Sequence, residues 1–330
     1  MPENATLLFI LFNLFIIAML ALDLGVFHKR EHAVSMKEAA TWYVVWVTLS
    51  LLFNVFVYFM YEHRWWGAGS LGPVELSGNE AALQFFTGYL IEVALSADNI
   101  FVFVVILSYF GVPAQYQHKV LFWGVLGALI MRFTFIGAGT ILIARFEWIL
   151  YIFGGILIVS GWKMLFQRET EVHPEKNIFI RLARKFFPVL AGYETSKFIV
   201  RRHGKLHITS MLLVLIAVET TDVVFAVDSI PAVFAVTRDP FIIYTSNVFA
   251  ILGLRSLYFV LARLMNSFFY LRYGLSVVLI FIGVKMLITD FYHIPIGISL
   301  AVIGGILAIS VGGSLYRSRR LNMGPVPDKE

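Results

Sequence analysis

Long apolar stretches, separated by short polar segments, follow one another along most of the chain. Each stretch is long enough for a helix that crosses a lipid bilayer, which takes about 20 residues. The strict alternation of apolar and polar residues that marks a strand of a membrane barrel is missing. The pattern therefore predicts an all-α polytopic membrane protein with about nine transmembrane helices. We place them near residues 5–27, 40–61, 82–108, 119–143, 148–166, 207–236, 241–262, 273–290 and 294–316.

The composition agrees with a membrane protein. Of the 330 residues, 59% are hydrophobic and 14% are charged, whereas a soluble domain carries about 25% charged residues. So high an apolar content also excludes a disordered chain. The sequence contains no cysteine, which excludes disulfides, thiolate metal sites and a cysteine nucleophile.

Lys and Arg are unevenly divided between the two ends of the predicted helices. If the N-terminus lies outside, 19 of them fall in cytoplasmic segments and 3 in outside loops. Cytoplasmic enrichment of basic residues is the known determinant of orientation. No basic residue precedes the first apolar stretch, so we expect a retained helix and not a cleaved signal peptide. The N-terminus is therefore predicted outside and the C-terminus in the cytoplasm.

Residues 167–206 form the one long polar segment between the predicted helices, and nine of the basic residues lie in it. A formal net charge of +5 would suggest nucleic acid as a partner of a soluble protein. In a membrane protein it fits the surface of an anionic bilayer better. We expect a solvated cytoplasmic loop beside the lipid bilayer and no nucleic-acid partner, and the sequence does not predict protein partners.

Two segments of the chain resemble each other. Residues 151–165 and 273–287 both begin with tyrosine and carry lysine twelve residues later. Polar and glycine landmarks occur in the same order at offsets of 122 to 124 residues. The matched pairs are Gly161 and Gly283, Arg132 and Arg255, and Asp98 and Asp222.

Each predicted repeat contains three helices. Because three is odd, the second copy enters the membrane from the opposite side, which gives a 3+3 inverted repeat. Such repeats are typical of secondary transporters, whose substrate site lies near the membrane midplane between the repeats. The chain then divides into helices 1 and 2 at 1–61, repeat 1 at 82–166, the basic loop at 167–206, repeat 2 at 207–290, and the last helix with its tail at 294–330.

Six carboxylates lie in or near the predicted helices, where a charge costs at least about 2.5–3.5 kcal/mol. Glu219 and Asp222 are three residues apart and share one helix face. Pro231 can kink or break its long helix, and a break near Asp228–Pro231 would re-aim Asp228. The six acids are Asp23, Glu92, Asp98, Glu219, Asp222 and Asp228.

The candidate ligands beside these acids are amide and hydroxyl oxygens. Oxygen donors favour a hard divalent cation such as Mg²⁺, Ca²⁺ or Mn²⁺ over zinc or copper. The alternative is that the acids pair with buried cations, and Arg132 and Arg255 are the candidates for structural ion pairs. The neutral oxygen donors near the acids are Ser96, Asn99, Thr220, Thr221, Ser229, Ser246 and Asn247.

Motifs for nucleotide binding and acyl transfer are absent from the sequence, so we expect neither an enzyme nor a primary pump, and no cofactor. The residues favour a secondary transporter of a divalent cation. Two alternatives stay open. An exporter of another small solute would use Arg132 and Arg255 as partners of an anion. A membrane scaffold for a stress-response complex would act through residues 167–206.

The polar motifs of the predicted helices resemble those of the TerC family of integral membrane proteins, and the similarity extends over nearly the whole chain. The motifs are Glu92-x3-Ser96-x-Asp98-Asn99, Glu219-x2-Asp222-x2-Phe225-Ala226-x-Asp228-Ser229-Ile230-Pro231-Ala232, and Ser246-Asn247-x2-Ala250-x-Leu252-Gly253-Leu254-Arg255.

The resemblance implies a bacterial inner-membrane protein linked to manganese export, metal homeostasis, pH stress and tellurium resistance. Mn²⁺ would be the transported substrate, moved by alternating access between the two repeats. Exchange for protons is a hypothesis, since a carboxylate must lose its proton to bind a metal. The motif match implies that the cation-binding set is Glu92, Asp98, Asn99, Glu219, Asp222 and Asp228, with Asp23, Ser96, Ser229 and Asn247 as further residues of the path. Val93 departs from the family, many of whose members have a polar or basic residue there.

Overall fold

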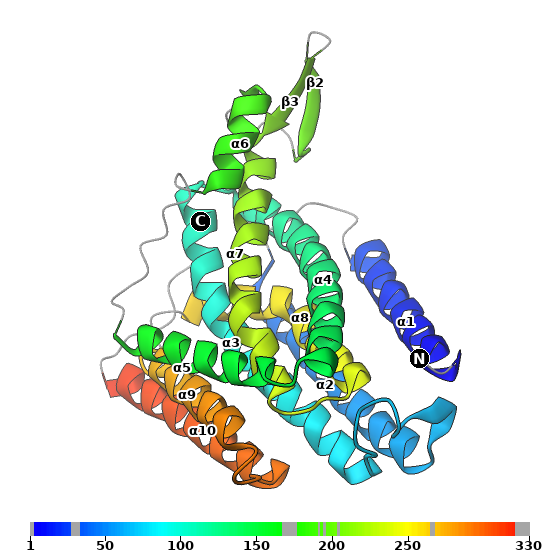
Figure 1. Cartoon of the computed structure of the whole chain (residues 1–330). Helices are drawn as coiled ribbons and strands as arrows, with labels where there is room; N and C mark the ends of the chain where they lie inside the picture. Colours follow the sequence, from blue (N-terminus) through cyan, green and yellow to red (C-terminus); the bar gives the residue numbers. More distant parts are fainter. Residues whose placement is uncertain are drawn as a thin grey trace.

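A computed structural model gives the architecture of the chain. It describes residues 3–27, 34–166, 177–190, 192–193, 196–202, 205–264 and 268–320, without the side chains of 3–5, 22–27 and 205. This part of the chain is almost entirely helical (Figure 1). The helices are α1 (Glu3–Phe27), α2 (Met36–Glu62), η1 (Trp65–Gly67), α3 (Gly78–Tyr109), α4 (Ala114–Arg145), α5 (Ile149–Phe166), α6 (Ile178–Phe186), α7 (Ser210–Phe234), α8 (Pro240–Leu264), α9 (Leu271–Ile288) and α10 (Ile296–Arg320).

The long helices coincide with the apolar stretches of the sequence. Among the described residues, eight helices, α2 to α5 and α7 to α10, are long and apolar enough to cross a membrane. The apolar part of α1, Thr6–Ala21, is shorter. The prediction of an all-α polytopic membrane protein is thus confirmed. The inverted repeat and the division of the chain into segments stay predictions.

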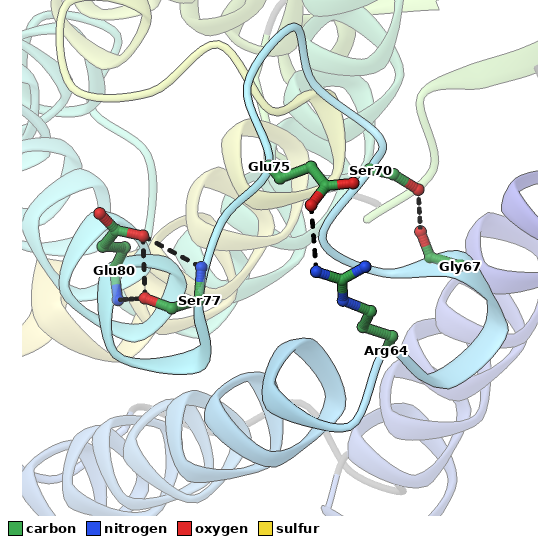
Figure 2. Close-up of polar contacts among 6 residues, drawn as sticks. All are labelled: Arg64, Gly67, Ser70, Glu75, Ser77 and Glu80. Atoms are coloured by element: carbon green, nitrogen blue, oxygen red, sulfur yellow. Dashed lines mark hydrogen bonds and ion pairs between the residues drawn. The ribbon is translucent and has the colours of Figure 1, made fainter.

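The link between α2 and α3 shows how polar residues fix the start of a long apolar helix. Ser77 Oγ accepts a hydrogen bond from the Glu80 backbone N–H at 3.3 Å, and Glu80 Oε2 accepts one from the Ser77 N–H at 3.0 Å (Figure 2). This capping box satisfies N–H groups that have no partner within the helix. In the same link, Arg64 and Glu75 form an exposed ion pair at 3.0 Å. Both charged side chains of this pair lie at the surface of the protein.

Two groups of helices make up the bundle. The first is built on α3 and α8, which are buried along most of their length; α3 also packs against α2 and α7, and α4 packs against α7 and α8. In the second group, α9 packs against both α5 and α10 (Figure 1). The α5 and α9 backbones touch, since a Cβ atom at Gly283 would lie 2.7 Å from the Gly154 carbonyl oxygen. Such small residues allow close approach of membrane helices.

The expected break in the helix that carries Pro231 is not present. α7 runs without interruption from Ser210 to Phe234, and the Ala235 N–H donates to the Pro231 carbonyl at 3.1 Å. The proline lies in the last turn, where it removes a single N–H and leaves few residues to displace. Asp228 is therefore not re-aimed by a kink, and its side chain keeps the direction that a straight helix gives it.

The segment between α5 and α7 contains structure that the sequence analysis did not predict. Its described part holds α6 and a sheet of three strands, β1 (Val189–Leu190), β2 (Ile199–Arg202) and β3 (Lys205–Thr209), in the order β1-β3-β2. β3 pairs parallel with β1 and antiparallel with β2. The Tyr193 hydroxyl donates to the Phe110 carbonyl at 2.7 Å, and Lys119 Nζ donates to Ser196 Oγ at 3.0 Å. These contacts hold the segment against the junction of α3 and α4.

A buried acid caps the start of α8. Asp239 precedes Pro240, and its Oδ1 accepts hydrogen bonds from the backbone N–H groups of Phe241 at 2.9 Å and Ile242 at 3.1 Å. The residue is 2% exposed. Burial raises the pKa of the Asp239 carboxyl, although these two hydrogen bonds work in the opposite direction. Keeping the Asp239 carboxylate charged therefore lowers the stability of the folded protein.

This cost predicts how stability depends on pH. An acid whose pKa is raised in the folded state stabilises the fold fully below its unfolded pKa, about 3.9 for Asp, and that contribution is lost as the pH rises through the folded value. Asp239→Asn keeps the capping oxygen without the charge, so its melting temperature should equal that of the wild type near pH 4 and exceed it increasingly toward neutral pH. Asp239→Ala also removes the carboxyl but loses the cap, so it should be about 0.5–2 kcal/mol less stable than Asp239→Asn at every pH. A difference between wild type and Asp239→Asn that does not change with pH would contradict the assignment.

Candidate functional site

A buried ion pair lies at the centre of the group formed by α3, α4, α7 and α8. Arg132 Nη1 on α4 lies 2.6 Å from Glu92 Oε1 on α3, and their side chains are 2% and 0% exposed. The same guanidinium nitrogen donates to Asn247 Oδ1 on α8 at 2.7 Å. The Asn247 amide in turn donates to the Ile243 carbonyl at 3.1 Å. Three helices thus meet at one charged group.

Helical spacing explains which polar residues of α3 face this centre. Glu92, Ser96 and Asn99 are four and three residues apart, so they lie on one face of the helix. All three are buried. Asp98 lies six residues after Glu92, which turns its side chain by about 240° away from that face. Asp98 is only partly buried, and the nearby cation that acts on it is Arg272, at the start of α9.

Asp222 on α7 completes the central group, and one of its oxygens is unpaired. The carboxylate is close enough to interact electrostatically with both Arg132 and Glu92. Among the described residues none donates a hydrogen bond to Asp222 Oδ2, although the residue is 4% exposed. A buried polar atom without a partner is costly. Within the same described part of the chain, Glu92 Oε2 and Arg132 Nε in this centre also lack a hydrogen-bond partner, so Asp222 Oδ2 is one of several buried atoms here that a small ligand would satisfy.

A small cavity lies next to Asp222. Its volume is about 10 Å³, and its lining includes Asp222, Arg255 and Tyr258 as the polar or charged side chains, with Gly124 and Val218 among the others. This is the lower limit for a single water molecule. In this conformation the cavity beside Asp222 has room for nothing larger than a water molecule.

Glu219 lies one turn before Asp222 on α7, and its carboxyl group packs directly against Gly127 on α4. A Cβ atom at Gly127 on α4 would overlap the Glu219 carboxyl group, so the two helices can pack here only because position 127 has no side chain. Asp222 is the charge that acts most directly on Glu219. Next to it, Thr220 Oγ1 accepts a hydrogen bond from Asn177 Nδ2 at 2.6 Å. Glu219 thus joins the central group to the surface beside α6.

The remaining predicted site residues lie elsewhere. Asp228, six residues after Asp222, faces α5, where Ser160 Oγ donates to its Oδ1 at 2.6 Å and Lys163 is the nearby cation. Ser229 is buried, and the side chain of Asp23 falls outside the described residues. Within the described parts of the chain, no three Asp, Glu or His side chains are close enough together to hold a metal ion. The structure brings together Glu92, Asp222, Glu219 and Asn247, and it places Asp98 and Asp228 on other helix faces.

Two residues of this region were missed from the sequence. Tyr258 lines the cavity, and its place three residues after Arg255 was a usable signal because both then share a face of α8. Gly127 leaves the room that Glu219 occupies. Nothing in the sequence distinguishes it from the other glycines in the apolar stretches, so only the packing of α4 on α7 shows its role.

Comparison with known proteins agrees with the geometry of a membrane bundle. The model of the "Integral membrane protein TerC family" matches residues 77–322. An uncharacterised membrane protein of Myxococcus xanthus is 50% identical over 308 residues, which cover 93% of this chain and 92% of that protein. The Salmonella typhi protein named "Putative membrane-bound redox modulator Alx" is 49% identical over 301 residues, or 91% of each chain. No solved structure matches the chain. The chain belongs to the TerC family of integral membrane proteins.

Proposed function

We propose that this protein is a secondary transporter that exports a divalent cation, with Mn²⁺ as the first candidate, across the bacterial inner membrane. The observation that carries the proposal is the unpaired carboxylate oxygen of Asp222, buried beside Glu92 and Arg132 on a closed cavity. Keeping such charges within a bilayer is expensive and is typical of ion pathways. Because the surrounding donors are oxygens and the sequence has no cysteine, a hard cation fits better than a soft one.

Arg132 explains how an acidic centre can stay closed without its substrate. The guanidinium neutralises Glu92 and acts on Asp222, so it occupies the electrostatic position that a bound cation would take. A divalent cation that entered between Glu92, Asp222 and Asn247 would replace this arginine as their partner. Under the proposal, the described arrangement is the closed, unloaded state, and Arg132 moves away when the ion binds. In each transport cycle the divalent cation would thus take the place of the Arg132 guanidinium beside the acids, and the guanidinium would return when the ion leaves.

Proton exchange is the proposed driving force. Carboxylates bind a metal ion in their deprotonated form, so loading the site releases any protons that they hold. The test uses the full chain in liposomes that enclose a fluorescent Mn²⁺ indicator, with and without a pH gradient. We expect a larger Mn²⁺ influx than in liposomes without the protein. The initial rate should be faster when the interior is more acidic than the outside than when the pH is equal on both sides. Equal rates under both conditions would contradict proton coupling, and no influx above background would contradict Mn²⁺ transport.

The name of the Alx relative suggests a redox role, and the composition limits what that role can be here. The chain has no cysteine, so it cannot exchange thiols and disulfides. Under the present proposal, an effect on cellular redox state would follow indirectly from a change in metal content. If so, added Mn²⁺ should enlarge any redox defect of a null strain that lacks the exporter, and a Mn²⁺ chelator in the medium should reduce that defect.

A further inference from the structure

The short helix α6 has three distinct faces. It begins at Ile178, where Asn177 Oδ1 caps it by accepting hydrogen bonds from the N–H groups of Phe179 at 2.9 Å and Ile180 at 3.3 Å. One face carries Ile180, which is 1% exposed and packs into the protein. A second face exposes large apolar side chains, and the third carries only basic ones. The exposed apolar residues are Ile178, Phe179, Leu182 and Phe186, and the basic residues are Arg181, Arg184 and Lys185.

α6 lies beside a helix that is long and apolar enough to cross the membrane. It runs next to the first half of α7, to which Asn177 is bound through Thr220 (Figure 1). A mainly apolar groove of about 460 Å³ lies between the two helices, lined by residues such as Leu182, Phe186, Leu212 and Ile216, with Glu219 and Thr220 as its polar members. Since α7 contacts lipid on any side that protein does not cover, the exposed apolar face of α6 is continuous with a lipid-facing surface.

The charge around α6 identifies the chemistry of the partner. Between residues 177 and 209 the sequence has seven Lys or Arg and one acidic residue. Two of these seven, Arg201 and Arg202, are exposed on the strand β2 near the same end of the molecule (Figure 1). A helix with an apolar face and a basic face lies in the interface of an anionic membrane, with its apolar side chains among the acyl chains. A soluble acidic partner would satisfy the charges but would leave the apolar groove against water.

We propose that α6 is an interfacial helix that binds anionic phospholipid headgroups through Arg181, Arg184 and Lys185 while its exposed apolar face enters the acyl-chain region of the same leaflet. The proposal rests on the fold and not on the transported ion. It holds or fails independently of Mn²⁺ transport.

The absence of cysteine from the sequence makes a direct test possible, because a single introduced cysteine can be labelled alone. A bimane probe at Leu182→Cys reports on α6, and the same probe at Ile309→Cys, 77% exposed on α10, is the matched lipid-facing control. Both full-length variants are reconstituted with phosphatidylcholine and a minor share of phosphatidylglycerol, with bromine quenchers on one lipid or the other. We expect brominated phosphatidylcholine to quench both probes. Brominated phosphatidylglycerol should quench the probe on α6 about two- to five-fold more than its fraction of the total lipid predicts, because a few basic residues attract anionic headgroups.

The outcomes decide between the possible partners. Equal quenching by phosphatidylglycerol at the two positions would overturn the anionic preference. A probe on α6 that is quenched by aqueous iodide and by neither lipid would place the helix in water, where it is free for an acidic protein. In the variant Arg181→Gln, Arg184→Gln, Lys185→Gln, quenching by phosphatidylcholine should persist while the preference for phosphatidylglycerol disappears. The single change Arg184→Gln gives a partial loss if the triple variant does not fold.

Discussion

Replacing Arg132 with methionine should lower the free energy of unfolding by about 3–5 kcal/mol, the usual cost of removing one partner of a buried ion pair. The change leaves the fully buried Glu92 without its cation at 2.6 Å. It also removes the donor to Asn247 Oδ1 and the positive charge near Asp222. Methionine keeps much of the side-chain volume, so the loss measures charge and hydrogen bonding more than a cavity. Thermal unfolding of the purified protein in one detergent, followed by circular dichroism, gives the comparison.

A double-mutant cycle separates the ion pair from the rest of the effect. Adding Glu92→Gln to Arg132→Met removes the stranded charge, so the double variant should be more stable than the two single losses predict, by about 0.5–3 kcal/mol. The pair of Arg64 and Glu75 (Figure 2) is the matched control, because its charged atoms lie 3.0 Å apart. Its side chains are 70% and 67% exposed. Arg64→Met should cost no more than about 1 kcal/mol. If Arg132→Met cost no more than Arg64→Met, the centre of the bundle would not depend on this charge.

The helices could be predicted from the sequence because a bilayer allows few other solutions. A chain in lipid must satisfy its own backbone hydrogen bonds, so stretches such as 82–108 and 241–262 had to be helical, and α3 and α8 follow them closely. The acids within the helices could also be predicted, because a charged residue in an apolar stretch is rare and costly in a bilayer. Glu219 and Asp222 were placed on one face by their spacing alone, as the structure has them on α7.

The grouping of the acids could not be predicted, because it depends on how separate helices pack. Glu92 pairs with Arg132 across 40 positions of sequence, and only the packing of α3 and α4 decides that contact. Six-residue spacing turns Asp98 and Asp228 away from Glu92 and Asp222 by about 240° when the helices stay straight. Pro231 can kink or break a helix, and the continuous α7 shows that a proline in the last turn need not do so. α6 was missed for another reason: it is only nine residues long and lies within a strongly basic segment, where composition alone suggests a solvated loop.

Asp222→Asn should abolish Mn²⁺ transport without destabilising the protein. Asparagine keeps the size and an oxygen of the side chain but removes the charge that a divalent cation needs. We expect the Mn²⁺ influx to fall by at least about ten-fold, the loss that even outer-shell changes cause at metal sites. In the folded state Arg132 still neutralises Glu92, and the variant no longer buries a charged oxygen without a hydrogen-bond partner. The melting temperature should therefore equal or exceed that of the wild type.

This combination of results distinguishes a functional acid from a structural one. A residue that only supported the fold would lose stability and transport together, whereas a residue kept for function at a cost in stability shows the opposite pattern. Asp290→Asn is the control, because it makes the same chemical change at the exposed contact between Asp290 and Tyr151, at the end of α9 and away from the buried centre. It should leave the Mn²⁺ influx unchanged. If Asp222→Asn transported Mn²⁺ as well as Asp290→Asn, an exporter of another solute or a scaffold that acts through residues 167–206 would replace the cation transporter as the better explanation of the buried acids.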